Sequence, residues 1–229
     1  MKTIGIIGGF GPETTAEFYL EVVFGCMKKS AVERPHVLIS SVPLPLQIER
    51  DLIATNTGAE RYIPYLVAEA KRLESAGADF LVLPCNSLHV FIDNIRESVK
   101  IPVLSILEEA AKYIKKNNYE KIGLISTSAT VKNKIYEQLF SEKRIDYIVP
   151  DGLEQAQMDK IIQRLVDGEH LNGDREQILK IVKNLKLQNV DAIALACTDL
   201  QLLLPHDDDL PIFDTMQVLA DASVHEILS

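Results

Sequence analysis

Two cysteines stand in short polar segments that follow apolar runs. Cys85 lies in Pro84–His89, which reads Pro-Cys-Asn-Ser-Leu-His, and Cys197 lies in Ala196–Leu200, which reads Ala-Cys-Thr-Asp-Leu. The apolar runs before them, at 78–83 and 190–195, are typical of buried parallel strands. Because ligands bind at the carboxyl ends of strands in open α/β sheets, both thiols are predicted to lie in a ligand-binding or active site.

Two thiols that face one substrate suit proton transfer at a stereocentre, since one removes a proton and the other returns one to the opposite face. The pKa of an isolated thiol is about 8.5, and a helix N-terminus or a cation lowers it, so a thiolate base is within reach near neutral pH. Asn86, Ser87 and Thr198 are predicted hydrogen-bond donors for the charge that develops. The alternative for each cysteine alone is an inert buried thiol, which is how we interpret Cys26.

The segments that would position these thiols occur twice. Three segments of the first half reappear in the same order in the second: 2–8 as 120–126, 78–85 as 190–197, and 101–106 as 210–215. We therefore predict an α/β fold of two pseudo-symmetric domains, each a mostly parallel sheet flanked by helices, with the active site in the cleft between them. The first domain, with Cys85, takes 1–102 plus 211–229, and the second, with Cys197, takes 103–210. Chance similarity among apolar strands is the alternative.

Hydrophobic periodicity and turn residues predict the remaining elements. We expect a strand over 3–7, a helix over 13–29, a strand over 36–42, helices over 60–76 and 107–116, helices within 154–186 broken at Gly168 and Gly173, and a helix at the C-terminus.

Three segments are candidate carboxylate sites. The glycine turn 8–12 resembles a nest of backbone amides that binds a small anion, whereas its spacing and Pro12 fit a dinucleotide poorly. The turn 126–130, rich in hydroxyl groups, either binds a carboxylate or caps the next helix. Arg50, beyond the second strand, either clamps a carboxylate or pairs with an acidic neighbour on the surface.

Composition excludes several classes of protein. The formal charge of -9, with no basic stripe, argues against nucleic-acid and membrane-surface partners. Three cysteines do not make a disulfide framework in 229 residues, and neither Cys85 nor Cys197 has the companions that a metal site needs. A strand begins almost at the first residue, which leaves no room for a signal peptide, so we expect a cytoplasmic protein with reduced thiols and no metal.

The motifs at 6–15, 84–89 and 196–200 resemble the aspartate/glutamate racemase family, and within it the aspartate racemases most closely. The resemblance covers essentially the whole chain. It implies a two-base racemase that uses neither pyridoxal phosphate nor any other cofactor and that is commonly a homodimer. It makes Cys85 the catalytic base for the D-face and Cys197 the base for the L-face. The positions that match substrate-binding or supporting residues are Phe10, Gly11, Arg50, Asn86, Ser87, Thr127, Thr130 and Thr198, with Gln47, His89 and Asp199 as possible supporting residues.

The expected function is therefore the interconversion of L- and D-aspartate. This chain has Ser87-Leu88 where the family more often has Thr-Ala, and Ala196 and Asp199 where it more often has Gly and Glu. Many aspartate racemases also carry a lysine at 165–175, where this chain has none. A glutamate or broad-specificity racemase, a maleate isomerase, or an arylmalonate decarboxylase or hydantoin racemase of similar architecture are alternatives. From another class, a non-catalytic small-carboxylate sensor also remains open.

Overall fold

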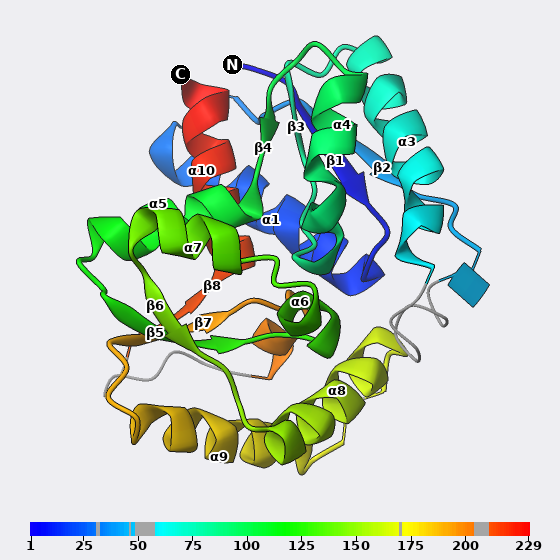
Figure 1. Cartoon of the computed structure of the whole chain (residues 1–229). Coiled ribbons are helices and arrows are strands. Elements are labelled where there is room, and N and C mark those ends of the chain that lie inside the picture. The colour runs from blue at the N-terminus through cyan, green and yellow to red at the C-terminus, as the bar shows by residue number, and fades with distance from the viewer. Residues whose placement is uncertain (31–32, 46, 49–57, 170, 204–210) are drawn as a thin grey trace. The chain divides into compact units, whose positions relative to one another are not determined.

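The computed structural model describes the whole chain apart from residues 31–32, 46, 49–57, 170 and 204–210 (Figure 1). The described residues form two compact units, Met1–Ile106 with Met216–Ser229, and Leu107–Thr215. The predicted division after residues 102 and 210 stays a prediction. No helix among the described residues is long and apolar enough to cross a membrane.

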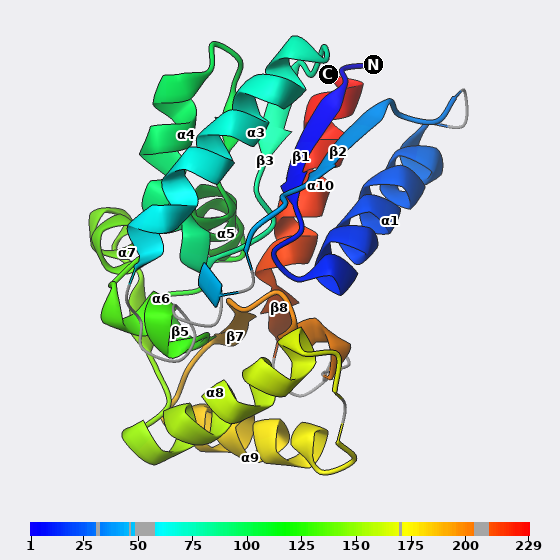
Figure 2. The ribbon, with the colours of Figure 1, turned by 90° about the vertical axis from the view of Figure 1, so that its right-hand side faces the viewer.

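The first unit is built on a four-stranded parallel sheet. Its order is β2-β1-β3-β4, from β1 (Ile4–Gly8), β2 (Val37–Ser41), β3 (Phe80–Val82) and β4 (Val103–Leu104). Figure 2 shows α3 (Ile63–Ser75) and α4 (Ile92–Ser98) on one face of the sheet, and α1 (Pro12–Lys29) and α10 (Thr215–Leu228) on the other. Two short 3-10 helices, η1 (Ala59–Tyr62) and η2 (Ser87–Phe91), complete the unit.

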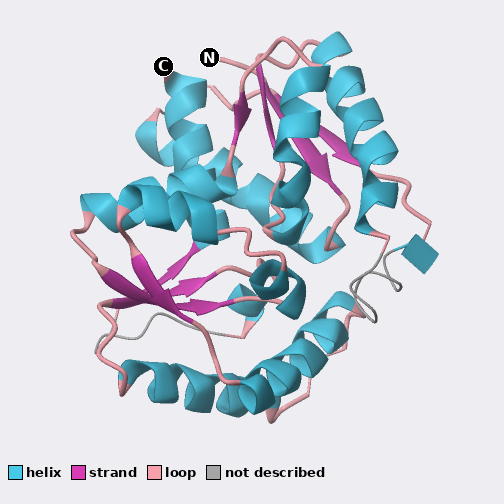
Figure 3. Cartoon of the chain, viewed as in Figure 1, coloured by secondary structure: helices cyan, strands magenta, loops and turns pink. Residues whose placement is uncertain are grey.

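The second unit repeats this sheet. Its order is β6-β5-β7-β8, from β5 (Lys121–Ile125), β6 (Asp146–Ile148), β7 (Ala192–Leu195) and β8 (Ile212–Asp214), all parallel. In Figure 3, α8 (Gly152–Val166) and α9 (Asp174–Lys186) cover one face, and α5 (Ile106–Lys116) and α7 (Glu137–Lys143) cover the other. The short α6 (Ser128–Lys132) follows β5, and η3 (Leu200–Leu202) follows β7. The predicted fold of two related α/β halves is confirmed.

Each central strand carries a glycine where a helix packs closely against the sheet. A Cβ at Gly5 of β1 would lie 3.2 Å from the Cβ of Leu73 on α3, and one at Gly123 of β5 would lie 3.2 Å from Leu185 on α9. The same Cβ atoms would lie still closer to side chains of the neighbouring strands, 2.6 Å from Leu81 Cδ2 and 2.5 Å from Ile193 Cδ1, so a larger residue would force these side chains and the facing helix residues to shift. The shared Ile-Gly pattern of the two strands thus reflects the same helix-on-sheet contact in both halves.

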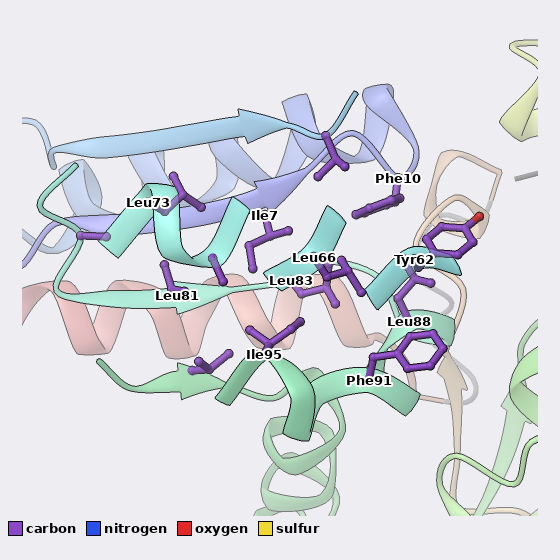
Figure 4. Packing of buried hydrophobic residues seen from close by; sticks show 14 of the residues in the cluster. Ile7, Phe10, Tyr62, Leu66, Leu73, Leu81, Leu83, Leu88, Phe91 and Ile95 are labelled. Atoms are coloured by element: carbon purple, nitrogen blue, oxygen red, sulfur yellow. The ribbon is translucent and has the colours of Figure 1, made fainter. Parts of the chain in front are cut away.

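Apolar side chains between the first sheet and its helices form the core that fixes the strand ends. Ile7, Leu66, Leu81 and Ile95 are fully buried in it, and Figure 4 shows Phe10 at one end of this cluster. The second unit has an equivalent core between α8, α9 and β7. These cores hold β1 and β3, and likewise β5 and β7, in parallel register, so that the carboxyl ends of each pair open at one edge of their sheet.

Several elements differ in detail from those expected. The predicted helix over 60–76 starts as η1 and becomes α-helical only at Ile63, because Pro64 has no N–H to donate and fits the first turn of a helix. Most strands are shorter than their apolar runs. Edge strand β6 follows a half-exposed pattern, Asp-Tyr-Ile, that carries little hydrophobic signal.

Candidate functional site

Cys85 lies in the turn that leaves β3. Its backbone N–H donates to the carbonyl of Leu83 at 2.8 Å, and its Sγ lies 3.5 Å from Oγ of Ser87. The thiol residue is partly exposed, whereas Asn86 beside it is buried. A hydroxyl at that distance can donate to a thiolate and stabilise its negative charge.

His89 contacts the same turn through its imidazole ring. Its Nδ1 lies 2.7 Å from the carbonyl oxygen of Cys85, and its Nε2 accepts the backbone N–H of Ile106 at 3.0 Å. The imidazole is almost completely buried. The sequence predicted a possible supporting role for His89, and both of these contacts are with backbone groups.

The glycine turn after β1 lies at the same edge of the sheet, since β1 and β3 are neighbours. The amide of Gly9 donates to Oγ1 of Thr15 at 3.0 Å, and this hydroxyl donates to the carbonyl of Gly11 at 3.1 Å. Gly9 and Gly11 have positive φ angles of 93° and 80°, which favour glycine. Thus the predicted nest uses one amide internally, while the amides of Phe10 and Gly11 have no acceptor within the described residues.

Cys197 follows β7 in the second unit. It is buried, and its Sγ donates toward Oδ2 of Asp199 at 3.8 Å. The amide of Ala196 donates to the carbonyl of Ile125 at 2.7 Å, which ties this turn to the end of β5. Thr198, which separates Cys197 from Asp199 in the sequence, is also buried. The two thiols therefore have different polar neighbours, a hydroxyl for Cys85 and a carboxylate for Cys197.

Thr127 and Thr130 join this turn from the end of β5. Oγ1 of Thr127 accepts the amide of Thr130 at 3.2 Å as the N-cap of α6, and the two hydroxyl oxygens are 3.1 Å apart. Of the two alternatives for this turn, the helix cap is present. One hydroxyl hydrogen lies between the two oxygens, which leaves the other to donate to a ligand.

Two polar residues of α8 hold this turn, and the sequence analysis did not single them out. Asp159 accepts both the amide and the hydroxyl of Ser128, the amide at 2.9 Å. Gln155 donates to the carbonyl of Ser126 at 2.9 Å and to Asp159 at 3.0 Å. The sequence signal was a polar pair at i and i+4 beside the apolar face of α8, of which Met158 is part.

The buried end of β5 also contains polar atoms with no hydrogen-bond partner. Within the described residues, Oγ of Ser126 and Oε1 of Gln155 are buried and accept or donate to nothing. Leaving such atoms unpaired costs free energy, so a ligand or a water molecule that bonds to them would be favoured at this end of the sheet.

The structure adds little on the other residues that the sequence singled out. Gln47 is exposed, and Arg50 lies outside the described residues. Cys26 is fully buried in α1, and burial raises the pKa of its thiol. The described residues contain no group of three His, Cys, Asp or Glu side chains suited to hold a metal ion.

Comparison with known proteins identifies a matching family and several similar chains. The sequence model of the Asp/Glu/Hydantoin racemase family matches residues 7–223. A broad-specificity amino-acid racemase of Bacillus subtilis, RacX, is 29% identical over 231 residues, covering 99% of this chain and 98% of that protein.

Solved structures agree over the full chain. A candidate Asp/Glu racemase from Yersinia pestis matches with a TM-score of 0.88 and 27% identity, covering 100% of both chains. An aspartate racemase homologue from Pyrococcus horikoshii matches with a TM-score of 0.81 and 26% identity, again over 100% of both chains.

Proposed function

Because this chain belongs to the Asp/Glu/hydantoin racemase family, we propose that it racemises an amino acid by proton transfer between Cys85 and Cys197. In the proposed reaction one thiolate removes the Cα proton, and the opposite thiol donates its proton to the other face of the same carbon. The thiolate and thiol exchange roles in each turnover, so no net charge or proton is consumed. No metal, pyridoxal phosphate or other cofactor takes part in this scheme.

The single observation that supports this proposal most strongly is the equivalent placement of the two thiols. Each follows the strand that is third in a four-stranded parallel sheet, β3 in one unit and β7 in the other. Each also has an oxygen-bearing side chain two residues further on. A single nucleophilic cysteine would give no reason for this repetition.

The neighbours of the thiols support different resting states. The Ser87 hydroxyl stabilises a thiolate at Cys85, whereas the Asp199 carboxylate accepts the S–H of Cys197 and disfavours its ionisation. The resting enzyme would therefore have Cys85 ionised and Cys197 protonated, which is the state that can remove the Cα proton of the D-enantiomer. The family resemblance assigns the D-face to Cys85, in agreement with this direction.

Other groups at the two sheet edges are suited to hold the substrate. The amides of Phe10 and Gly11, Asn86, and the hydroxyls of Thr127, Thr130 and Thr198 supply donors for a carboxylate. Arg50 is proposed as a second carboxylate contact from the sequence alone. These donors stabilise the negative charge that spreads from Cα into the carboxylate as the proton leaves.

Aspartate is the proposed substrate. The sequence motifs match aspartate racemases most closely, and a structural neighbour is an aspartate racemase homologue. A broad-specificity racemase is the second candidate, supported by the Bacillus subtilis relative and by the lack of lysine between Lys160 and Lys180. Without that lysine, fewer contacts select an acidic side chain.

The test is proton NMR in D2O with L-aspartate, followed by L-glutamate and neutral amino acids, without added pyridoxal phosphate or metal. Loss of the Cα proton signal with formation of the D-isomer is the expected result for aspartate. Turnover of many amino acids would favour broad specificity. Conversion of maleate alone would point to an isomerase, and tight binding without any exchange would point to a sensor.

A homodimer in the cytoplasm is part of the proposal. The outer face of α1 carries Leu20, Phe24 and Met27, spaced i, i+4 and i+7 and all exposed. Glu17 precedes this stripe and Lys28 follows it, so two copies of α1 packed antiparallel would set opposite charges against each other. The free thiols Cys26, Cys85 and Cys197 suit a reducing compartment.

A further inference from the structure

The ring nitrogens of His89 have fixed and different roles. A backbone N–H can only donate, so the Nε2 that lies 3.0 Å from the amide of Ile106 must be an acceptor. The ring hydrogen is then on Nδ1, where it donates to the carbonyl of Cys85 at 2.7 Å. His89 is thus neutral and joins the turn that carries one thiol to the first residue of α5.

Thr215 makes a corresponding link in the second unit. Its hydroxyl donates to the carbonyl of Leu195 at 2.9 Å, two residues before Cys197. The side chain is fully buried and also hydrogen-bonds to the buried Tyr136, whose pKa is raised by burial. Thr215 is the first residue of α10, so here too the start of a helix is joined to the thiol-bearing segment.

Ile106 and Thr215 hold matching positions in the chain. Each follows the last strand of its sheet, β4 or β8, and each is the last residue of its unit before the chain enters the other one. The two helices that connect the units therefore both begin at a hydrogen bond to a segment that carries a thiol. An imidazole makes this connection in the first unit and a hydroxyl makes it in the second. In both units the connection joins the start of a helix to the backbone of the thiol-bearing segment.

We propose that His89 and Thr215 are a matched pair of positioning residues, each of which fixes one catalytic thiol relative to the helix that leads into the other unit. This inference rests on the proposed two-thiol racemisation. Proton transfer from carbon is sensitive to displacements below 1 Å, so loss of either link slows the thiol on that side. Neither residue contacts the reacting atoms in this account, and both act through the backbone of the cysteine segments.

The test compares His89→Phe with Thr215→Val, each of which removes the hydrogen bonds while keeping most of the side-chain volume. Both variants are expected to lose about tenfold in kcat and to change KM by less than about twofold. The informative measurement is the primary isotope effect on kcat/KM with Cα-deuterated D-aspartate and L-aspartate, or with the best amino acid of the panel.

The two variants should move these isotope effects in opposite directions. With His89→Phe, abstraction by Cys85 becomes more rate-limiting, so the effect rises with the D-enantiomer and falls toward one with the L-enantiomer. With Thr215→Val the pattern is reversed. His89→Gln and Thr215→Ser keep donors and acceptors, and both are expected to restore the wild-type pattern; they also serve as the test if a first variant does not fold.

Equal changes with both enantiomers, or none, would overturn the inference and leave both residues merely structural. In that case racemisation by the wild-type protein would still support the proposed function. If the wild-type protein racemises no amino acid at all, the proposed function fails before the variants are measured. The two failures are therefore distinguishable.

Discussion

The imidazole Nδ1 of His89 lies 2.7 Å from the carbonyl oxygen of Cys85, within the turn that carries the thiol. Four residues separate the two positions, so the hydrogen bond closes the turn locally, and the bond from Ile106 then ties it to β4 and α5. The thiol is thus carried by a backbone that is held from a distant part of the chain, while the Cys85 residue is itself partly exposed.

Removing the polar neighbour of each thiol should have opposite effects on thiol ionisation. Ser87→Ala removes a donor to a Cys85 thiolate, so the pKa of Cys85 should rise, and Asp199→Asn removes a carboxylate, so the pKa of Cys197 should fall. Titration of thiolate absorbance in each variant, with Cys26→Ser as background, measures both shifts. Shifts in the same direction would contradict the assigned resting states.

Asp159 should matter for substrate binding although it lies behind the turn. Asp159→Ala removes the acceptor of the Ser128 amide and hydroxyl, so the turn with Thr127 and Thr130 loses its anchor. We expect kcat/KM to fall about tenfold, mainly through KM. Asp167→Ala, at the end of the same helix, is the control. An unchanged KM in Asp159→Ala would remove the turn from the proposed site.

Stability should depend on pH through Asp191. Its carboxylate accepts the amides of Lys121 and Glu120 at 2.9 and 2.8 Å, and these bonds lower its pKa from 3.8. A lowered pKa in the folded state contributes stability above the unfolded pKa, and this contribution is lost as pH falls through the folded value. Urea unfolding of Asp191→Asn should therefore show a deficit at pH 7 that shrinks below about pH 4. A deficit that is constant with pH would refute this role.

The outer face of α1 should hold the homodimer together. Phe24→Lys places a charge at the centre of the stripe and is expected to yield monomers in sedimentation at micromolar concentration. Leu187→Lys is the matched control, because Leu187 is highly exposed but lies outside this stripe. Glu17→Lys and Lys28→Glu should each weaken the dimer, and their combination should restore it. Dimers that persist in Phe24→Lys would move the interface elsewhere.

The sequence predicted the two halves because buried parallel strands and the turns that follow them are determined locally. Strand β3 and the segment around Cys85 match strand β7 and the segment around Cys197 in residue type as well as in order. Edge strand β6 escaped prediction because its short Asp-Tyr-Ile sequence is half-exposed and carries little hydrophobic signal.

The supporting residues were harder to predict. The bonds of His89 to Ile106 and of Gln155 to Ser126 span 17 and 29 residues, and no local spacing reveals them. Two roles were predicted for the turn that contains Thr127, and the structure shows that its side-chain oxygen caps α6. Burial and long-range hydrogen bonds, rather than residue type, decide such roles.

The most direct test of the two-thiol account follows Cα proton exchange in D2O for Cys85→Ser and Cys197→Ser, each with pure L- and pure D-aspartate. The account predicts that racemisation falls by at least about 10³ in both variants. Residual exchange should then be confined to the D-enantiomer when only Cys85 remains and to the L-enantiomer when only Cys197 remains, while Cys26→Ser behaves as wild type. Exchange of both enantiomers by either single-thiol variant would contradict the account.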